Sequence, residues 1–174
     1  FDFKSLGYKY SGKMEVLRQI LNRDYLQRKI RIIGGAYGRF VSFSREGIGY
    51  FGSYRDPQLS KTLKAFDDAP GFLKKLELSD REMTRFILGT ISSIDNPLKP
   101  YQQAGRALSY YLRGLTKEDI QRQRDEILGT TVNDIRGFSK FVDDIMKKNC
   151  YCVYGNEKTL EDNKTLFDKL IKVH

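Results

Sequence analysis

The pattern of apolar residues near the start of the chain is helical. Between Ser11 and Arg31 the apolar positions recur on one face, at Val16, Leu17, Ile20, Leu21 and Ile30. This spacing predicts a helix. Gly34 and Gly35 follow its last turn, where glycine commonly ends a helix because it tolerates a left-handed backbone.

A strand-like alternation follows directly. Val41 and Phe43 alternate with neighbours that include two serines, and a second alternating run contains Ile48, Tyr50 and Tyr54. With the letters SREG between them, the two runs predict an antiparallel β-hairpin over residues 37–55.

Helical patterns resume after Asp56. Pro57 is expected near a first helical position, where its missing N–H does no harm. The letters SDRE form a capping box from Ser79 to Glu82 ahead of an apolar helical stripe. The letters NPLKP at 96–100 then break the helix, and Thr116 is placed to cap a later one. A further stripe over residues 130–148 predicts another amphipathic helix.

The end of the chain returns to strand-forming residues, with the letters CYCVY at 150–154 and a short amphipathic tail behind them. We therefore expect an α+β fold in which an antiparallel sheet, made of hairpin 37–55 and strand 150–154, packs against several helices. Because so small a sheet is marginal alone, we expect it to be incomplete at its N-terminal side. Either residues around Phe1 and Phe3 pair with it, or upstream chain completes it.

Composition and charge narrow the classes of partner. The 174 residues suffice for one domain with a hydrophobic core. No run approaches the roughly 20 apolar residues that span a bilayer, and the first residues do not resemble a signal peptide. The net charge of +9 comes from basic residues interleaved with acids, without a basic block or an RNA-binding aromatic motif. We expect no membrane and no nucleic-acid partner; a basic RNA-binding module is the remote alternative.

The two cysteines, Cys150 and Cys152, are too close in sequence for an unstrained mutual disulfide. The only histidine is the terminal His174, so the cysteines lack partners for a metal site. We interpret them as buried or half-buried reduced thiols, which favours a reducing compartment. We expect this chain to bind no metal.

A search for catalytic motifs leaves one pair of residues. The chain has no H-E-x-x-H or H-x-x-E-H zinc motif and no G-x-S-x-G nucleophile turn. In the letters RIIGGAYG, Arg31 and Tyr37 flank Gly34 and Gly35. In a structural interpretation, Arg31 closes a helix and Tyr37 begins a strand. In a functional one, the glycines let guanidinium and phenol point into one cavity and donate to a carbonyl or a developing oxyanion.

The same letters resemble the R-x-x-G-G-A-Y-G signature of the presequence protease branch of the insulinase (pitrilysin-like) zinc metallopeptidases. The stretches LGYKYSGKMEVLRQILNRDYL before it and ILGTISSIDNPLKPYQQAGRALSYYLRGLTKEDIQRQRDEILGTT after it are also similar to that family. The resemblance covers nearly the whole chain and is loosest after Gly155.

This resemblance implies that residues 1–174 are the C-terminal part of the last of four related α+β domains. In that family two halves close a chamber around an unstructured peptide, and the first domain holds zinc through an H-x-x-E-H motif and a downstream glutamate. The signature assigns Arg31 to a substrate backbone carbonyl and Tyr37 to a hydrogen bond with the tetrahedral intermediate. Gly34 and Gly35 would shape the backbone between them.

The implied partners are the N-terminal, zinc-bearing half of the same polypeptide and an unstructured peptide substrate. Zinc would be a cofactor of the full-length parent only, so we expect this chain alone to be inactive. The expected location is the cytoplasm, with an organelle matrix as the alternative. An open edge strand would favour self-association of the isolated chain. A non-catalytic structural subunit of the same fold also stays open, and an intact upstream zinc motif would decide against it.

Overall fold

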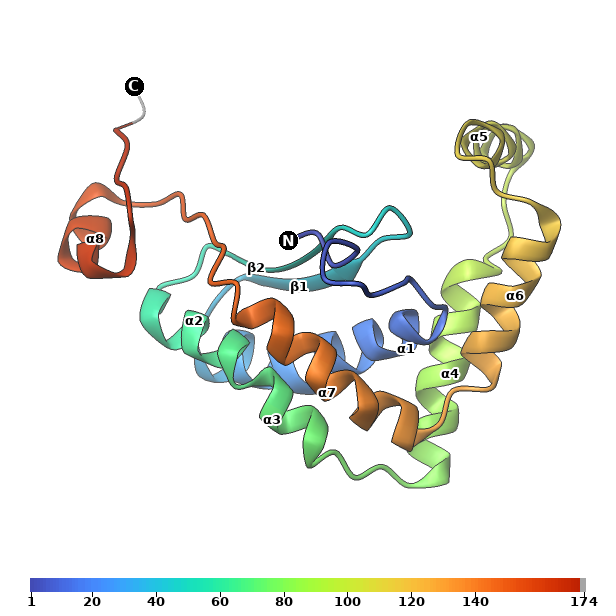
Figure 1. Ribbon diagram of the computed structural model, residues 1–174, viewed down its shortest axis with the longest axis horizontal. Helices are drawn as coiled ribbons and strands as arrows, with labels where there is room; N and C mark the ends of the chain where they lie inside the picture. The colour runs from blue at the N-terminus through green and yellow to red at the C-terminus, as the bar shows by residue number, and fades with distance from the viewer. Residues whose placement is uncertain (173–174) are drawn as a thin grey trace.

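The computed structural model describes residues 1–172, and His174 lies outside them. A two-stranded hairpin lies on a layer of helices, with further helices at both ends of the molecule (Figure 1). The expected α+β class is confirmed. Elements in chain order after the hairpin are α2 (Leu59–Asp67), α3 (Ala69–Lys74), α4 (Asp80–Ile94), α5 (Pro100–Leu112), α6 (Lys117–Leu128), α7 (Val132–Met146) and α8 (Glu157–Asp162), and a 3₁₀ turn η2 (Lys164–Leu166) follows.

The predicted first helix is confirmed, but its hydrogen-bonding changes along its length. Helix α1 (Lys13–Ile20) continues without a break into the π-helical segment η1 (Leu21–Ile33). The buried residues of η1 recur every four or five positions, at Leu21, Tyr25, Leu26 and Ile30. That spacing suits i→i+5 hydrogen bonds. Together the two segments form one long element that ends at Gly34.

The predicted hairpin is also confirmed. Strand β1 (Gly38–Phe43) pairs antiparallel with β2 (Gly49–Tyr54), and Val41 lies opposite Phe51. Gly47 closes the turn with a φ of +96°, a conformation that favours glycine. The first residues of the chain continue the sheet beyond β2, through an antiparallel bridge between Asp2 and Ile48. The N-terminal residues therefore pair with the sheet, which was one of the two expected alternatives.

One face of the hairpin is buried against the helices and contributes to a single core. Phe141 on α7 lies at its centre, where its ring contacts Phe3, Tyr8, Phe43 and Phe138 with centroids 4.9 to 5.9 Å apart. Edge-to-face arrangements dominate these contacts, as expected for aromatic pairs. The core joins the hairpin, α1 and α7 into one body that holds the turn after η1 in place.

The helix starts follow the predicted capping signals. Ser79 and Glu82 form the expected capping box at α4, and Thr116 caps α6. The expected break at 96–100 is confirmed, because α4 ends before it and α5 begins at Pro100. Pro57 does not open a helix, since it precedes Gln58, the N-cap residue of α2.

The predicted strand at 150–154 is wrong. These residues are extended but belong to no sheet, and Cys150 and Cys152 are exposed free thiols rather than buried or half-buried ones. A strand needs a free neighbouring edge, and this segment leads away from the hairpin toward α8 (Figure 1). With no sheet neighbour to pack against, most of its side chains are exposed.

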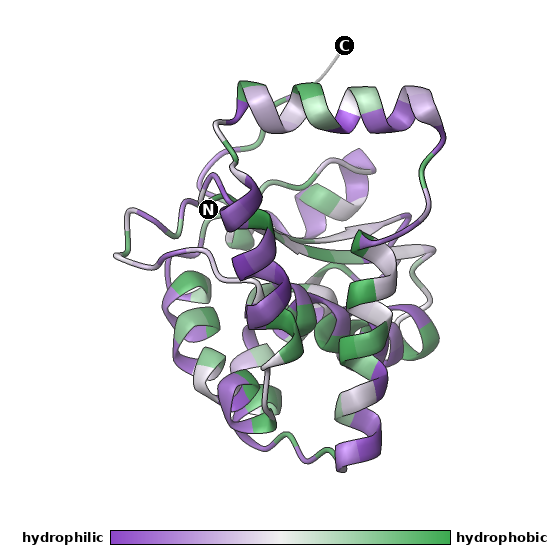
Figure 2. Cartoon of the chain, turned by 90° about the vertical axis from the view of Figure 1, so that its right-hand side faces the viewer, coloured by the Kyte–Doolittle hydropathy of each residue, from purple (hydrophilic) through white to green (hydrophobic). Residues whose placement is uncertain are grey.

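Helix α5 stands apart from the rest of the chain (Figure 2). None of its residues is buried, so even the large hydrophobic side chains of Tyr101, Leu108 and Leu112 are exposed. No helix within residues 1–172 is long and apolar enough to cross a membrane.

Candidate functional site

The turn between η1 and β1 depends on two glycines for different reasons. The N–H of Gly35 donates to the carbonyl of Arg31 at 3.1 Å, and the N–H of Ala36 donates to that of Ile30 at 3.1 Å. Gly35 has a φ of +77°, which side chains disfavour. Gly34 has an ordinary φ, but a Cβ there would lie 2.6 Å from the Ile30 carbonyl oxygen. The glycines thus end the helix and turn the chain sharply into the strand.

Tyr37 lies at the far end of this turn, immediately before β1. Its N–H donates to the carbonyl of Arg55 at 3.3 Å, which ties it to the end of β2. Its ring packs edge-on against Tyr54 with centroids 6.2 Å apart, and the Arg55 guanidinium lies 5.8 Å from the ring centroid. Even so, Tyr37 is 66% exposed, and no hydrogen bond within residues 1–172 engages its hydroxyl.

Arg31 lies at the near end, in the last turn of η1, and is exposed. Neither a hydrogen bond nor an ion pair within residues 1–172 occupies its guanidinium. Arg39 on β1 lies near enough to feel its charge: burial lowers the pKa of Arg39, and the charges of Arg31 and Arg23 lower it further. This end of the helix therefore presents a positive potential to solvent.

Arg39 itself has an unusual environment on β1. Its Nε is buried and has no hydrogen-bond partner within the described residues, and neither has Oε1 of Gln27 on η1. Buried polar atoms normally find partners. Sequence reasoning missed Arg39, although its place two residues before Val41 puts it on the buried face of the strand.

The structure places Arg31 and Tyr37 at the two ends of one short turn. It does not join them directly: no hydrogen bond within residues 1–172 links the two side chains. Both side chains are exposed donors. The expectation that they point into one cavity stays a prediction.

The outer face of the hairpin extends this surface with aromatic rings. Phe40, Tyr50 and Tyr54 share the face opposite the helices and are 43%, 51% and 53% exposed. Phe40 packs edge-on against Tyr50, with centroids 6.0 Å apart, and its ring lies over Gly52. We refer to Phe40, Tyr50 and Tyr54 as the aromatic face. Exposed apolar patches of this kind mark binding surfaces. The alternation in the sequence already contained the signal, since aromatic residues occur on both faces of the predicted hairpin.

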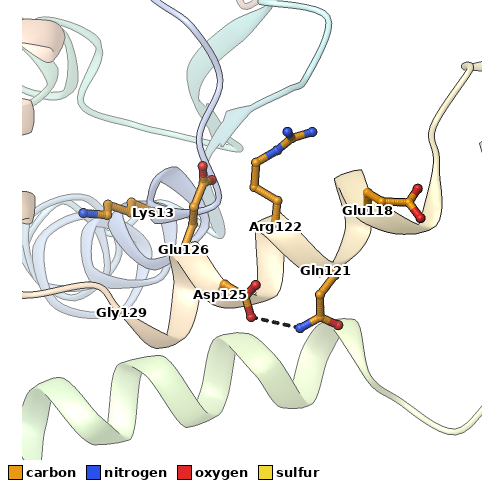
Figure 3. A pocket seen from close by; sticks show the side chains of 7 residues that line it. All are labelled: Lys13, Glu118, Gln121, Arg122, Asp125, Glu126 and Gly129. Carbon is orange, nitrogen blue, oxygen red and sulfur yellow. Dashed lines mark hydrogen bonds between the residues drawn. The ribbon is translucent and has the colours of Figure 1, made fainter.

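A separate polar pocket lies along α6 (Figure 3), lined by Lys13, Glu118, Gln121, Arg122, Asp125, Glu126 and Gly129. Its polar groups already serve the fold: Glu126 accepts from the N–H of Gly12 at 2.5 Å, and Lys13 pairs with Asp134 at 2.6 Å. No residue of the turn between η1 and β1 lines this pocket.

The side chains of the described residues do not fit a metal centre. Within residues 1–172, no group of three or more His, Cys, Asp or Glu side chains is placed to hold a metal ion.

Comparisons with known proteins agree on one family. The family described as "PreP C-terminal domain" matches residues 2–154. The chain is 43% identical over 172 residues to a protein of Clostridium perfringens named Protein HypA. The aligned stretch covers 99% of this chain and 18% of that protein. It is 36% identical over 145 residues to "Presequence protease 1, chloroplastic/mitochondrial" of Arabidopsis thaliana, covering 83% of this chain and 13% of that protein. A mitochondrial presequence protease of Emericella nidulans is 35% identical over 150 residues. The chain thus spans less than a fifth of these relatives.

Proposed function

Because this chain belongs to the family of PreP C-terminal domains, we propose that it is the substrate-contacting domain of a zinc metalloendopeptidase that degrades unstructured peptides in a closed chamber. Residues 1–174 would form the C-terminal part of the last domain of that enzyme. The resemblance to the presequence protease branch is confirmed by the family match and by relatives that carry that name.

In this proposal Arg31 and Tyr37 have separate roles. The Arg31 guanidinium donates to a backbone carbonyl of the bound peptide and holds the chain in register. The Tyr37 hydroxyl donates to the oxygen that becomes negative as the peptide carbonyl is attacked. A donor placed at such an oxygen typically raises the turnover rate kcat by a factor of ~10²–10³. Tyr37 would be the catalytic residue, while Gly34 and Gly35 act through the backbone that positions both donors.

The observation that carries this proposal is the unused hydrogen-bonding capacity at the turn. Arg31 and Tyr37 are exposed and have no hydrogen-bonding partner for their side chains within residues 1–172. The turn between them is nevertheless held firmly, by the hydrogen bonds of Gly35 and Ala36 and by the link from Tyr37 to Arg55. Fixed donors without internal partners suit a site that is completed by a substrate.

The aromatic face supports the same proposal. It begins at Tyr54, which contacts Tyr37, and continues across the hairpin to Phe40 and Tyr50. An extended peptide bound at Tyr37 would lay apolar side chains on these rings. Such contacts contribute affinity without demanding a particular sequence, as degradation of varied unstructured peptides requires.

Zinc and the remaining machinery would come from the N-terminal half of the parent, the expected partner of this chain. When bound there, zinc would supply Lewis-acid activation of water and carbonyl. We propose that the isolated chain is inactive and that the parent works in the cytoplasm or an organelle matrix. The names of two relatives include the words mitochondrial or chloroplastic.

The role of Arg31 is tested in the full-length parent by comparing Arg31→Ala and Arg31→Lys with wild type on a quenched, unstructured peptide at equal zinc content. We expect Arg31→Ala to lower kcat/KM by ~10-fold or more, mainly through KM, with partial recovery in Arg31→Lys because the charge returns without the planar fork. Arg28→Ala is the control, since Arg28 is exposed on the same helix. Unchanged kinetics in Arg31→Ala would contradict its role. An inactive wild type would favour the non-catalytic subunit.

A further inference from the structure

The first residue of the chain is already part of the sheet. The amine of Phe1 donates to the carbonyl of Gly49 at 3.1 Å, and the N–H of Gly49 donates to the carbonyl of Phe1 at 3.0 Å. The N–H of Phe3 then donates to the carbonyl of Gly47 at 2.8 Å. These bonds, with the bridge between Asp2 and Ile48, define an antiparallel register along the outer edge of β2.

The register also gives the direction in which earlier residues would run. Phe3 pairs with Gly47 and Phe1 pairs with Gly49, so the N-terminal segment runs in the direction opposite to β2. In the same register, a residue two positions before Phe1 would pair with Phe51, and a residue four positions before Phe1 would pair with Ser53. Residues placed before Phe1 in this register would therefore run along β2 and not away from it.

Within the part of the chain that the structure describes, no other backbone pairs with the outer edge of β2 beyond Gly49. The backbone groups of Gly49 point away from β1, so those of Phe51 and Ser53 point the same way, while those of Tyr50 and Gly52 face β1. The opposite edge of the hairpin differs, because the Asn22 side chain bonds both backbone groups of Val41 there. Among the described residues 1–172, only the β2 edge thus combines a started pairing with backbone groups that have no partner ahead of it.

We propose that the segment directly preceding Phe1 in the parent polypeptide forms a third strand along this edge. Relatives with 36–43% identity are more than five times as long as the matched stretch, which covers 13–18% of them. The residue two positions before Phe1 pairs with Phe51, and the residue four positions before it pairs with Ser53. This inference does not depend on the roles of Arg31 and Tyr37.

The register fixes which side chains of the new strand enter the core. The Phe1 ring packs over Gly49 on the helix side, Phe3 is fully buried, and Phe51 contacts Phe66 with ring centroids 5.6 Å apart. Since side chains alternate along a strand, the residues two and four positions before Phe1 face the same side and are expected to be apolar. The side chain of the residue three positions before Phe1 lies on the same side of the sheet as the aromatic face.

Hydrogen exchange in the full-length parent tests the pairing. We expect the amides of Phe51 and Ser53 to exchange ~100-fold or more slowly than in an open edge, without any added peptide. The amides of Tyr50 and Gly52 are internal controls, because β1 protects them in every case. Fast exchange at Phe51 and Ser53 would overturn the proposal. Protection only after addition of an unstructured peptide would assign the edge to substrate, and protection that rises with protein concentration would assign it to a second copy; either result would also overturn it.

A cysteine pair tests the register itself. We expect Ser53→Cys to form a disulfide on mild oxidation with a cysteine introduced four positions before Phe1, in a parent whose Cys150 and Cys152 are replaced by serine. A cysteine three positions before Phe1 is the matched control, because a shift by one residue turns it to the opposite face. Equal cross-linking at both positions, or none at either, would contradict the register.

Discussion

The side-chain amide of Asn22 hydrogen-bonds to both backbone groups of Val41. Its Nδ2 donates to the Val41 carbonyl at 3.2 Å, and its Oδ1 accepts from the Val41 N–H at 3.2 Å. One side chain thus replaces a neighbouring strand at the edge of β1. It also fixes η1, which ends with Arg31, against the strand that follows Tyr37.

Removing this amide should destabilise the chain. Asn22→Ala leaves the Val41 N–H and carbonyl without partners in a partly buried place, so we expect the free energy of unfolding to fall by about 1–3 kcal/mol. Urea denaturation measures this change in the free energy of unfolding. Asn133→Ala, at an exposed position of α7, should change stability by less than about 0.5 kcal/mol. Equal effects of the two substitutions would mean that the Asn22–Val41 pair contributes little.

Gly35 should be intolerant of a side chain. Its φ of +77° makes Gly35→Ala unfavourable by about 1–2 kcal/mol, and the distorted turn should lower kcat/KM of the parent. Gly137→Ala is the matched control, since Gly137 is exposed within α7 and a Cβ there meets nothing within 4 Å. That change should stabilise the chain by about 0.5–1 kcal/mol. A Gly35→Ala variant as stable as wild type would contradict the argument.

Asp134 should make stability depend on pH in the acid range. Burial raises the pKa of its carboxyl, but hydrogen bonds from Lys13 and from Thr131 outweigh burial, and the net pKa is lowered. A carboxyl with a lower pKa when folded contributes stability that is present above its unfolded pKa of about 3.9 and is lost as the pH falls through the folded pKa.

We therefore expect the free energy of unfolding to fall as the pH is lowered from about 5 to below about 3, and less steeply in Asp134→Asn than in wild type. Urea titrations at several pH values measure both slopes. Asn133→Ala, next to Asp134 and without a titratable group, should leave the wild-type slope unchanged. Identical slopes for Asp134→Asn and wild type would show that Asp134 is not a source of the dependence.

The aromatic face should contribute to peptide affinity rather than to the chemical step. In the parent, Phe40→Ala and Tyr50→Ala are expected to raise KM for an unstructured peptide by ~3–10-fold each, with kcat nearly unchanged, because ring contacts act equally on the bound ground state and the transition state. Tyr111→Ala, on the exposed face of α5, is the control. A fall in kcat with constant KM would contradict this role. It would mean that these residues act in the catalytic step or that their loss distorts the hairpin.

The elements that depend on local patterns could be predicted from the sequence. The alternation around Val41 and Ile48 specified the hairpin, and the Ser79–Glu82 box specified the start of α4. The turn with Gly34 and Gly35 was also predictable, because its residue types are dictated by backbone conformation at one place.

The features that depend on a distant partner could not be predicted. The segment 150–154 has strand-forming residues, yet no sheet edge meets it, so Cys150 and Cys152 are exposed. The role of Asn22 was equally hidden, since a polar residue within a helical stretch gives no sign of the strand that it pairs with. For Arg31 and Tyr37, the signature predicted their place on the turn, while their action on a substrate stays a prediction.

The central claim is tested most directly by Tyr37→Phe in the full-length parent, which removes one hydroxyl and keeps the ring contact with Tyr54. On a quenched, unstructured peptide at equal zinc content, we predict a loss in kcat of ~10²-fold or more with little change in KM, while Tyr111→Phe behaves as wild type. Unchanged kcat in a folded Tyr37→Phe variant of an active parent would contradict the claim and leave Tyr37 with only a structural role, directly before β1.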